Sequence, residues 1–203
     1  MPDGGWRRPK GQVKQDMIVW ISGPTGSGKS SLTRMLASLG CATVQEELPP
    51  ELFRRFASNP AQHCEALQEA IMRSRFSRWQ SLRHNRRVIF DRGIDEDAHV
   101  FCRMHRDLGL LDDDQLVRLQ TLASDLQVTM PEPDLIIFMS PQRDVLKQRV
   151  TSATHPPLIV DNLDRQLTLY SEWLAARQGD VLRLDNSSCS LQTVRQLLDE
   201  GSC

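Results

Sequence analysis

The sequence predicts an α/β fold in which a five-stranded parallel β-sheet carries helices on both faces. Short apolar runs alternate with longer helical stretches along the chain, as in repeated strand-helix-strand units. Most of these apolar runs are continuous, which is typical of strands that are buried on both sides of a sheet. A chain of 203 residues is long enough to form one such domain with a substantial core.

Five segments have the length and composition of buried strands. They are residues 17–22, 41–45, 87–91, 134–139 and 181–185. Ligands of open parallel sheets bind beyond the carboxyl ends of the strands, so the residues that follow these segments are the best candidates for chemistry.

Helices are expected between and after the strands. Three starts have a local cause: Asn59 and Pro60 begin the second helix, Asp112 caps the fourth, and Pro141 lies in the first turn of the fifth. A lid over a phosphate site is expected near 149–160, where a segment rich in Thr, Ser and Pro joins two helices. The expected helices are 29–38, 61–84, 95–108, 112–127, 141–150, 160–177 and 191–200.

The bulk properties limit the kinds of partner. Residues 1–16 are polar and basic, which predicts a disordered tail before a single domain that spans 17–203. The formal net charge is -1, which argues against a nucleic acid polymer or an anionic membrane as the main partner. No apolar segment reaches the roughly 18 residues of a membrane span. The five cysteines lack paired spacings, which predicts reduced thiols and a cytoplasmic location.

Residues 23–30 form a complete Gly-x4-Gly-Lys-Ser phosphate loop, and the first predicted strand stands directly before it. Glycines let backbone amides approach phosphate oxygens closely, and the helix N-terminus that follows adds partial positive charge. Lys29 is expected to bind phosphate as a mobile cation, and Ser30 to supply a hydroxyl ligand to Mg²⁺. The predicted polyphosphate site consists of Gly23, Thr25, Gly26, Ser27, Gly28, Lys29, Ser30 and Ser31.

An acid and an arginine follow the third predicted strand. Asp91 stands where phosphate-loop proteins place the second magnesium anchor, opposite Ser30. Arg92 would neutralise charge on the transferring phosphoryl group, because a guanidinium binds two oxygens at once. The alternative interpretation is a turn with a surface ion pair.

Two glutamates, Glu46 and Glu47, follow the second predicted strand. Either one would accept a proton from an acceptor hydroxyl if partial burial raised the pKa of its carboxyl group. The alternative is that they are helix-start acids before Pro49.

Together these features resemble the deoxynucleoside kinase family, in particular its bacterial deoxyadenosine and deoxyguanosine kinases. The resemblance runs from about Ile18 to Leu184, is most specific over 91–101, and continues through 133–141 and 163–173. It implies a three-layer P-loop NTPase fold. It also implies that ATP and Mg²⁺ serve to phosphorylate the 5′-hydroxyl of a deoxynucleoside.

The resemblance also implies residue roles. Glu47, or else Glu46, would be the base that acts on the 5′-hydroxyl, and Arg92 would orient it. Arg149 matches the first arginine of the family's lid, which clamps donor phosphates. The family's nucleobase-reading positions correspond to Gln68, Arg75 and Asp97, of which the first two would otherwise be expected on a solvated helix face and the third as a helix cap. The family also implies a homodimer built on the helices over 61–84 and 95–127.

The chain departs from the family pattern at Ala57, Gly93 and His155, and residues 151–155, where the family's lid has further arginines, contain none. These departures leave two alternatives open. One is a kinase that acts on a nucleoside monophosphate or a non-nucleoside alcohol. The other is a non-catalytic nucleotide-binding module.

Overall fold

The computed structural model describes residues 17–45, 50–152, 160–177, 179–185 and 194. The predicted tail over 1–16 lies outside this part of the chain, as does all but residue 194 of the helix predicted over 191–200. Within it, no helix is long and apolar enough to cross a membrane.

The core of the fold is a five-stranded sheet in which every pairing is parallel, as predicted. The strand order is β2-β3-β1-β4-β5, so the chain switches from one side of β1 to the other between β3 and β4. Such a switch opens a crevice at the carboxyl ends of the strands. The strands are β1 (Met17–Ser22), β2 (Ala42–Val44), β3 (Arg87–Asp91), β4 (Leu135–Met139) and β5 (Val181–Leu184).

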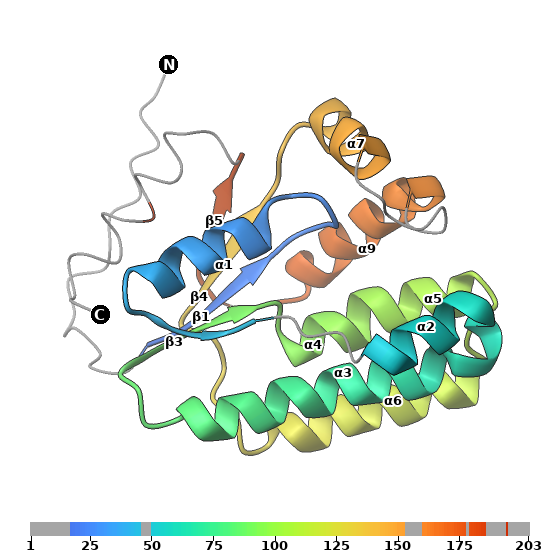
Figure 1. The fold of residues 1–203 in the computed structure, drawn as a ribbon, viewed down its shortest axis with the longest axis horizontal. Helices are drawn as coiled ribbons and strands as arrows, with labels where there is room; N and C mark the ends of the chain where they lie inside the picture. The colour runs from blue at the N-terminus through green and yellow to red at the C-terminus, as the bar shows by residue number, and fades with distance from the viewer. Residues whose placement is uncertain (1–16, 46–49, 153–159, 178, 186–193, 195–203) are drawn as a thin grey trace.

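Helices cover both faces of the sheet (Figure 1). Side chains alternate between the faces: Val19 and Ile21 of β1 belong to the core beneath α1, whereas Trp20 belongs to the larger core beneath the helices other than α1 and α7. The helices are α1 (Lys29–Ser38), α2 (Pro50–Ser58), α3 (Pro60–Leu82), α4 (Ile94–Glu96), the π-helix η1 (Asp97–Cys102), α5 (Arg103–Asp107), α6 (Asp113–Gln127), α7 (Arg143–Ser152) and α9 (Leu163–Ala175).

Two local signals acted as predicted. The Asn59 side chain accepts a hydrogen bond from the Gln62 amide at the start of α3. At the start of α6, Asp112 accepts from the Gln115 amide at 2.7 Å, and the Gln115 side chain accepts from the Asp112 amide at 2.9 Å.

The helix predicted over 95–108 is present as α4, η1 and α5 in direct succession, with π-helical turns in its middle. Two other expectations were wrong. Helix α2 was not predicted, although a proline at its first position suits a helix start. Cys41 is disulfide-bonded, whereas Cys64 and Cys102 are buried free thiols. The cysteine spacing gave no sign of the Cys41 disulfide, and the cytoplasmic location stays a prediction.

Candidate active site

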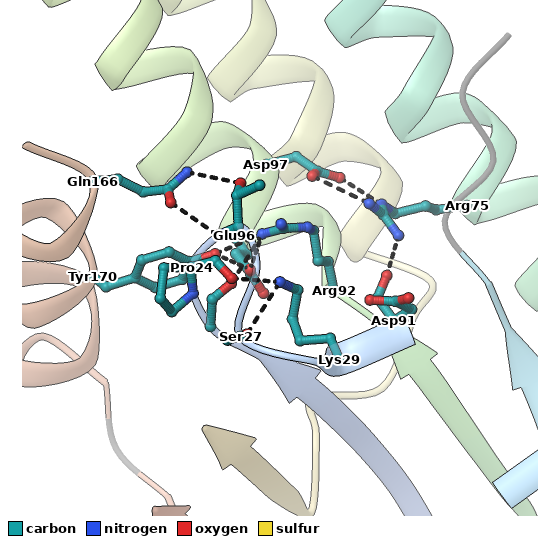
Figure 2. A network of polar contacts seen from close by, with 12 residues as sticks. Pro24, Ser27, Lys29, Arg75, Asp91, Arg92, Glu96, Asp97, Gln166 and Tyr170 are labelled. Atoms are coloured by element: carbon teal, nitrogen blue, oxygen red, sulfur yellow. Dashed lines mark hydrogen bonds and ion pairs between the residues drawn. The ribbon is translucent and has the colours of Figure 1, made fainter. Parts of the chain in front are cut away.

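The phosphate loop connects β1 to α1 at the carboxyl edge of the sheet (Figure 2). Two of its glycines are required by both conformation and space. Gly23 has a φ of 139°, and a Cβ there would lie 2.5 Å from the Met139 carbonyl oxygen. Gly26 has a φ of 80°, and its Cβ would lie 2.8 Å from a Val150 methyl group. Helix α7 therefore packs directly against this loop.

The Lys29 side chain folds back over its own loop. Its ammonium group donates to the Pro24 carbonyl oxygen at 2.8 Å and to Ser27 Oγ at 3.5 Å. Thr25 and Gly28 are half-buried, and Ser30 and Ser31 are exposed in the first turn of α1. The predicted loop residues thus lie in one short connection at the N-terminus of α1 with the Lys29 ammonium group beside it, an arrangement that suits a polyphosphate.

Asp91 ends β3 next to this loop, because it aligns with Ile21 in the parallel pairing of β1 and β3. It is 1% exposed, and its Oδ1 has no hydrogen-bond partner among the described residues. A buried carboxylate oxygen without a donor fits a divalent cation. No group of three or more His, Cys, Asp or Glu residues suited to a metal occurs in the described part.

Arg92 lies beside the phosphate loop and is buried. The alternative interpretation of Asp91 and Arg92 as a turn with a surface ion pair is therefore wrong. Its Nη1 donates to Tyr170 Oη at 2.6 Å, to Glu96 Oε1 at 2.9 Å and to the Gly23 carbonyl oxygen at 3.2 Å. The guanidinium also lies 4.3 Å from the centre of the Phe101 ring. The Arg92 backbone has a φ of 71°, a left-handed conformation that is uncommon outside glycine.

Arg75 of α3 and Asp97 of η1 form a buried ion pair, in which Nε donates to Oδ2 at 2.7 Å and Nη2 to Oδ1 at 3.5 Å. Arg75 also donates to the Asp91 backbone carbonyl oxygen, which ties this pair to the end of β3. Gln68 is 5% exposed and accepts a weak hydrogen bond from Cys102 Sγ at 3.9 Å. The solvated positions expected for Gln68 and Arg75 from sequence statistics alone are therefore wrong, and Asp97 is buried in an ion pair within the first turn of η1.

Gln68, Cys102 and Asp97 lie where η1 meets α3, and π-helical turns are frequent at functional sites. Burial raises the pKa of the Cys64 thiol to about 12, and it raises the pKa of the Cys102 thiol as well, so both stay protonated at neutral pH. Neither thiol is a nucleophile in this state.

Arg149 lies on α7 beside the phosphate loop. Its side chain is exposed, and its Cβ lies 3.7 Å from the position that a Cβ on Gly26 would take. Glu46 and Glu47 fall outside the described residues, as does His155.

Sequence reasoning missed Glu96, Gln166 and Tyr170. Gln166 accepts from the Thr25 amide at 2.9 Å and donates to Thr25 Oγ1 at 3.4 Å. These two hydrogen bonds tie α9 to the phosphate loop. Gln166 and Tyr170 are one helical turn apart and almost fully buried, which is unusual for a glutamine. That spacing was the only available signal, because their partners are distant in sequence.

The departure at Gly93 has a packing cause. A Cβ on Gly93 would lie 2.5 Å from the Trp20 ring, while the Gly93 φ of -96° suits any residue. The glycine therefore makes room for a buried tryptophan.

The comparisons with known proteins agree with this geometry. The family model described as deoxynucleoside kinase matches residues 19–194. A deoxyadenosine kinase of Dictyostelium discoideum is 35% identical over 175 residues, covering 82% of this chain and 71% of that protein. A deoxyguanosine kinase of Lactobacillus johnsonii is 28% identical over 171 residues, covering 77% and 75%.

Among solved structures, a deoxyadenosine kinase from M. mycoides with bound dCTP superposes with a TM-score of 0.75. The superposition covers 91% of this chain and 100% of the other at 16% sequence identity, which supports the fold.

Proposed function

The chain belongs to the deoxynucleoside kinase family, and from this premise we propose that it transfers the γ-phosphoryl group of ATP to the 5′-hydroxyl of a deoxynucleoside. One observation carries the proposal beyond family membership. The phosphate loop, the Asp91-Arg92 turn and the buried Arg75-Asp97 pair meet at one edge of the sheet (Figure 2). The proposed ATP site and the proposed nucleoside site thus lie next to each other, as direct transfer of a phosphoryl group between two bound substrates requires.

At the donor site, the loop amides and Lys29 would bind the ATP phosphates. Exposed Arg149, in the lid we propose over 149–160, would reach them from α7. Ser30 and Asp91 would hold Mg²⁺, and the unpartnered Oδ1 of Asp91 supports this assignment. When bound, the ion neutralises part of the phosphate charge. Arg92 would stabilise the charge that develops on the phosphoryl group.

At the acceptor site, Gln68, Arg75 and Asp97 would bind the edge of the nucleobase. Their burial supports this role. A buried site that hydrogen-bonds its substrate rejects analogues that lack the matching group, because the polar side chains of the site would then be left unpaired. Glu47, or else Glu46, would take the proton of the 5′-hydroxyl. The strand before them supports this placement, because Val44 at the end of β2 aligns with Phe90 directly before Asp91.

We also propose a homodimer that uses α3 and α6. Two exposed apolar side chains support this surface: Val117 is 59% exposed and Val128 is 81% exposed. They are eleven positions apart, which places them on nearly the same side of the helix that ends at Gln127. Light scattering during gel filtration, with Val117→Glu as the disrupting variant, tests the assembly.

Labelled ATP and a panel of deoxynucleosides, ribonucleosides and nucleoside monophosphates test the reaction. We expect label on deoxynucleosides and its loss in Lys29→Ala. Label transferred only to monophosphates would instead support the alternative acceptor class. No transfer above the Lys29→Ala background would refute the kinase.

A further inference from the structure

A buried polar network joins α9 to the phosphate loop and to Arg92 (Figure 2). Its members are Arg92, Glu96, Tyr170 and the Gly23 carbonyl group, and we call it the Tyr170 network. The Tyr170 hydroxyl accepts from Arg92 Nη1 at 2.6 Å. It has two acceptors for its own hydrogen, the Gly23 carbonyl oxygen at 2.7 Å and Glu96 Oε1. One hydroxyl group therefore touches the loop, the acid and the arginine.

Burial of these polar groups costs more free energy than burial of apolar side chains at the same place would. Arg92, Glu96 and Tyr170 are 4%, 0% and 1% exposed, and buried charges are expensive to remove from water even when they are paired. Glu96 Oε2 also lacks a hydrogen-bond partner among the described residues. The tyrosine ring would pack as well without its hydroxyl, since it contacts Phe101, Phe138 and Trp173. Packing alone therefore does not explain the polar groups.

The geometry constrains one group above all, the Arg92 guanidinium. Glu96 Oε1 and Tyr170 Oη both accept from its Nη1, and the centre of the Phe101 ring lies 4.3 Å from the guanidinium. The same Tyr170 hydroxyl contacts Gly23, the first residue of the phosphate loop. The position of the cation is thus fixed relative to the loop.

We infer that Glu96 and Tyr170 are positioning residues that hold Arg92 against the phosphate loop. The inference rests on the proposed function, in which Arg92 stabilises charge on the transferring phosphoryl group. A cation that is already oriented needs no rearrangement as that charge develops, which is the condition under which electrostatic stabilisation is most effective. Substrate binding depends mainly on other groups, so the network should affect turnover more than affinity.

Tyr170→Phe removes one oxygen and keeps the ring. We expect kcat to fall about tenfold or more, the usual effect of losing a hydrogen bond to a charged group. The KM values for ATP and deoxynucleoside should change less than about threefold, because the interactions that bind the ground state and the transition state equally well are left intact. The matched control is Thr168→Val, which removes one exposed hydroxyl and its hydrogen bond to the Asp164 carbonyl oxygen at 3.0 Å from the same helix without touching Arg92 or Tyr170. Its kcat should stay within about twofold of wild type on the same reasoning.

The decisive step repeats Tyr170→Phe in an Arg92→Ala background. If Tyr170 acts through Arg92, the second substitution causes no further loss of kcat, because the two effects are not additive. A Tyr170→Phe protein with wild-type kcat overturns the inference, as does an undiminished further loss in the Arg92→Ala background. A wild-type protein that transfers phosphate to no deoxynucleoside overturns the proposed function and the inference together, whereas an active wild type with unimpaired Tyr170→Phe overturns the inference alone.

Discussion

Removal of Arg75 should destabilise the protein and abolish nucleoside recognition, and the two effects can be separated. The Arg75 and Asp97 side chains are 2% and 4% exposed, so Arg75→Ala leaves a carboxylate buried without its cation. Breaking such a pair costs about 3 to 5 kcal/mol in free energy of unfolding. For a chain of this length, each kcal/mol lowers the melting temperature by roughly 2 to 4 °C. We therefore expect a fall of roughly 6 to 20 °C, measured by calorimetry.

The double variant Arg75→Met, Asp97→Leu supplies the control. Replacing both members of a buried ion pair by apolar residues of similar volume is often neutral for stability, so this protein should recover most of the lost melting temperature. A deoxynucleoside should nevertheless not stabilise this variant. In wild type, a deoxynucleoside at a hundred times its dissociation constant should raise the free energy of unfolding by about 2.7 kcal/mol. The reasoning is refuted if Arg75→Ala melts like wild type, or if the double variant is still stabilised by the ligand.

Two further predictions concern the core. Burial lowers the pKa of His105 from 6.5 to about 4, so the unfolded chain takes up a proton between these values while the folded protein does not. Stability contributed by neutral His105 is therefore present above pH 6.5 and falls as the pH drops toward 4. Between pH 7.5 and 5 the loss is about 2 kcal/mol, and His105→Phe should lose that much less than wild type in denaturant titrations. An equal acid loss in both proteins would contradict this. Gly93→Ala should cost about 1 to 3 kcal/mol because its Cβ meets the Trp20 ring, and it should cost less in a Trp20→Leu background. Strictly additive costs would show that the tryptophan is not the cause.

The phosphate loop was predictable because its function depends on a short contiguous spacing. Gly23, Lys29 and Ser30 lie within eight residues, where they would serve one ligand, and a buried strand precedes them. The strands over 17–22 and 87–91 were predicted to the residue, since runs buried on both faces are apolar throughout. Helix α2 was missed, although Glu46 and Glu47 were considered as acids at a helix start before Pro49.

The supporting residues were not predictable because their partners are far away in sequence. Tyr170 contacts Gly23 across 147 positions, and Gln166 contacts Thr25 across 141. No local pattern distinguishes these two side chains from the rest of an amphipathic helix. The burial of Arg75 was likewise not evident from its own helix, and only the resemblance to a family placed it in the site.

The most direct test of the kinase assignment is the identity of the product. After incubation with ATP, Mg²⁺ and a deoxynucleoside, phosphorus NMR should show ADP and a deoxynucleoside 5′-monophosphate in equal amounts over many turnovers. Lys29→Ala should form neither above background. Release of inorganic phosphate at the same rate with and without the deoxynucleoside, and no phosphomonoester, would contradict the account.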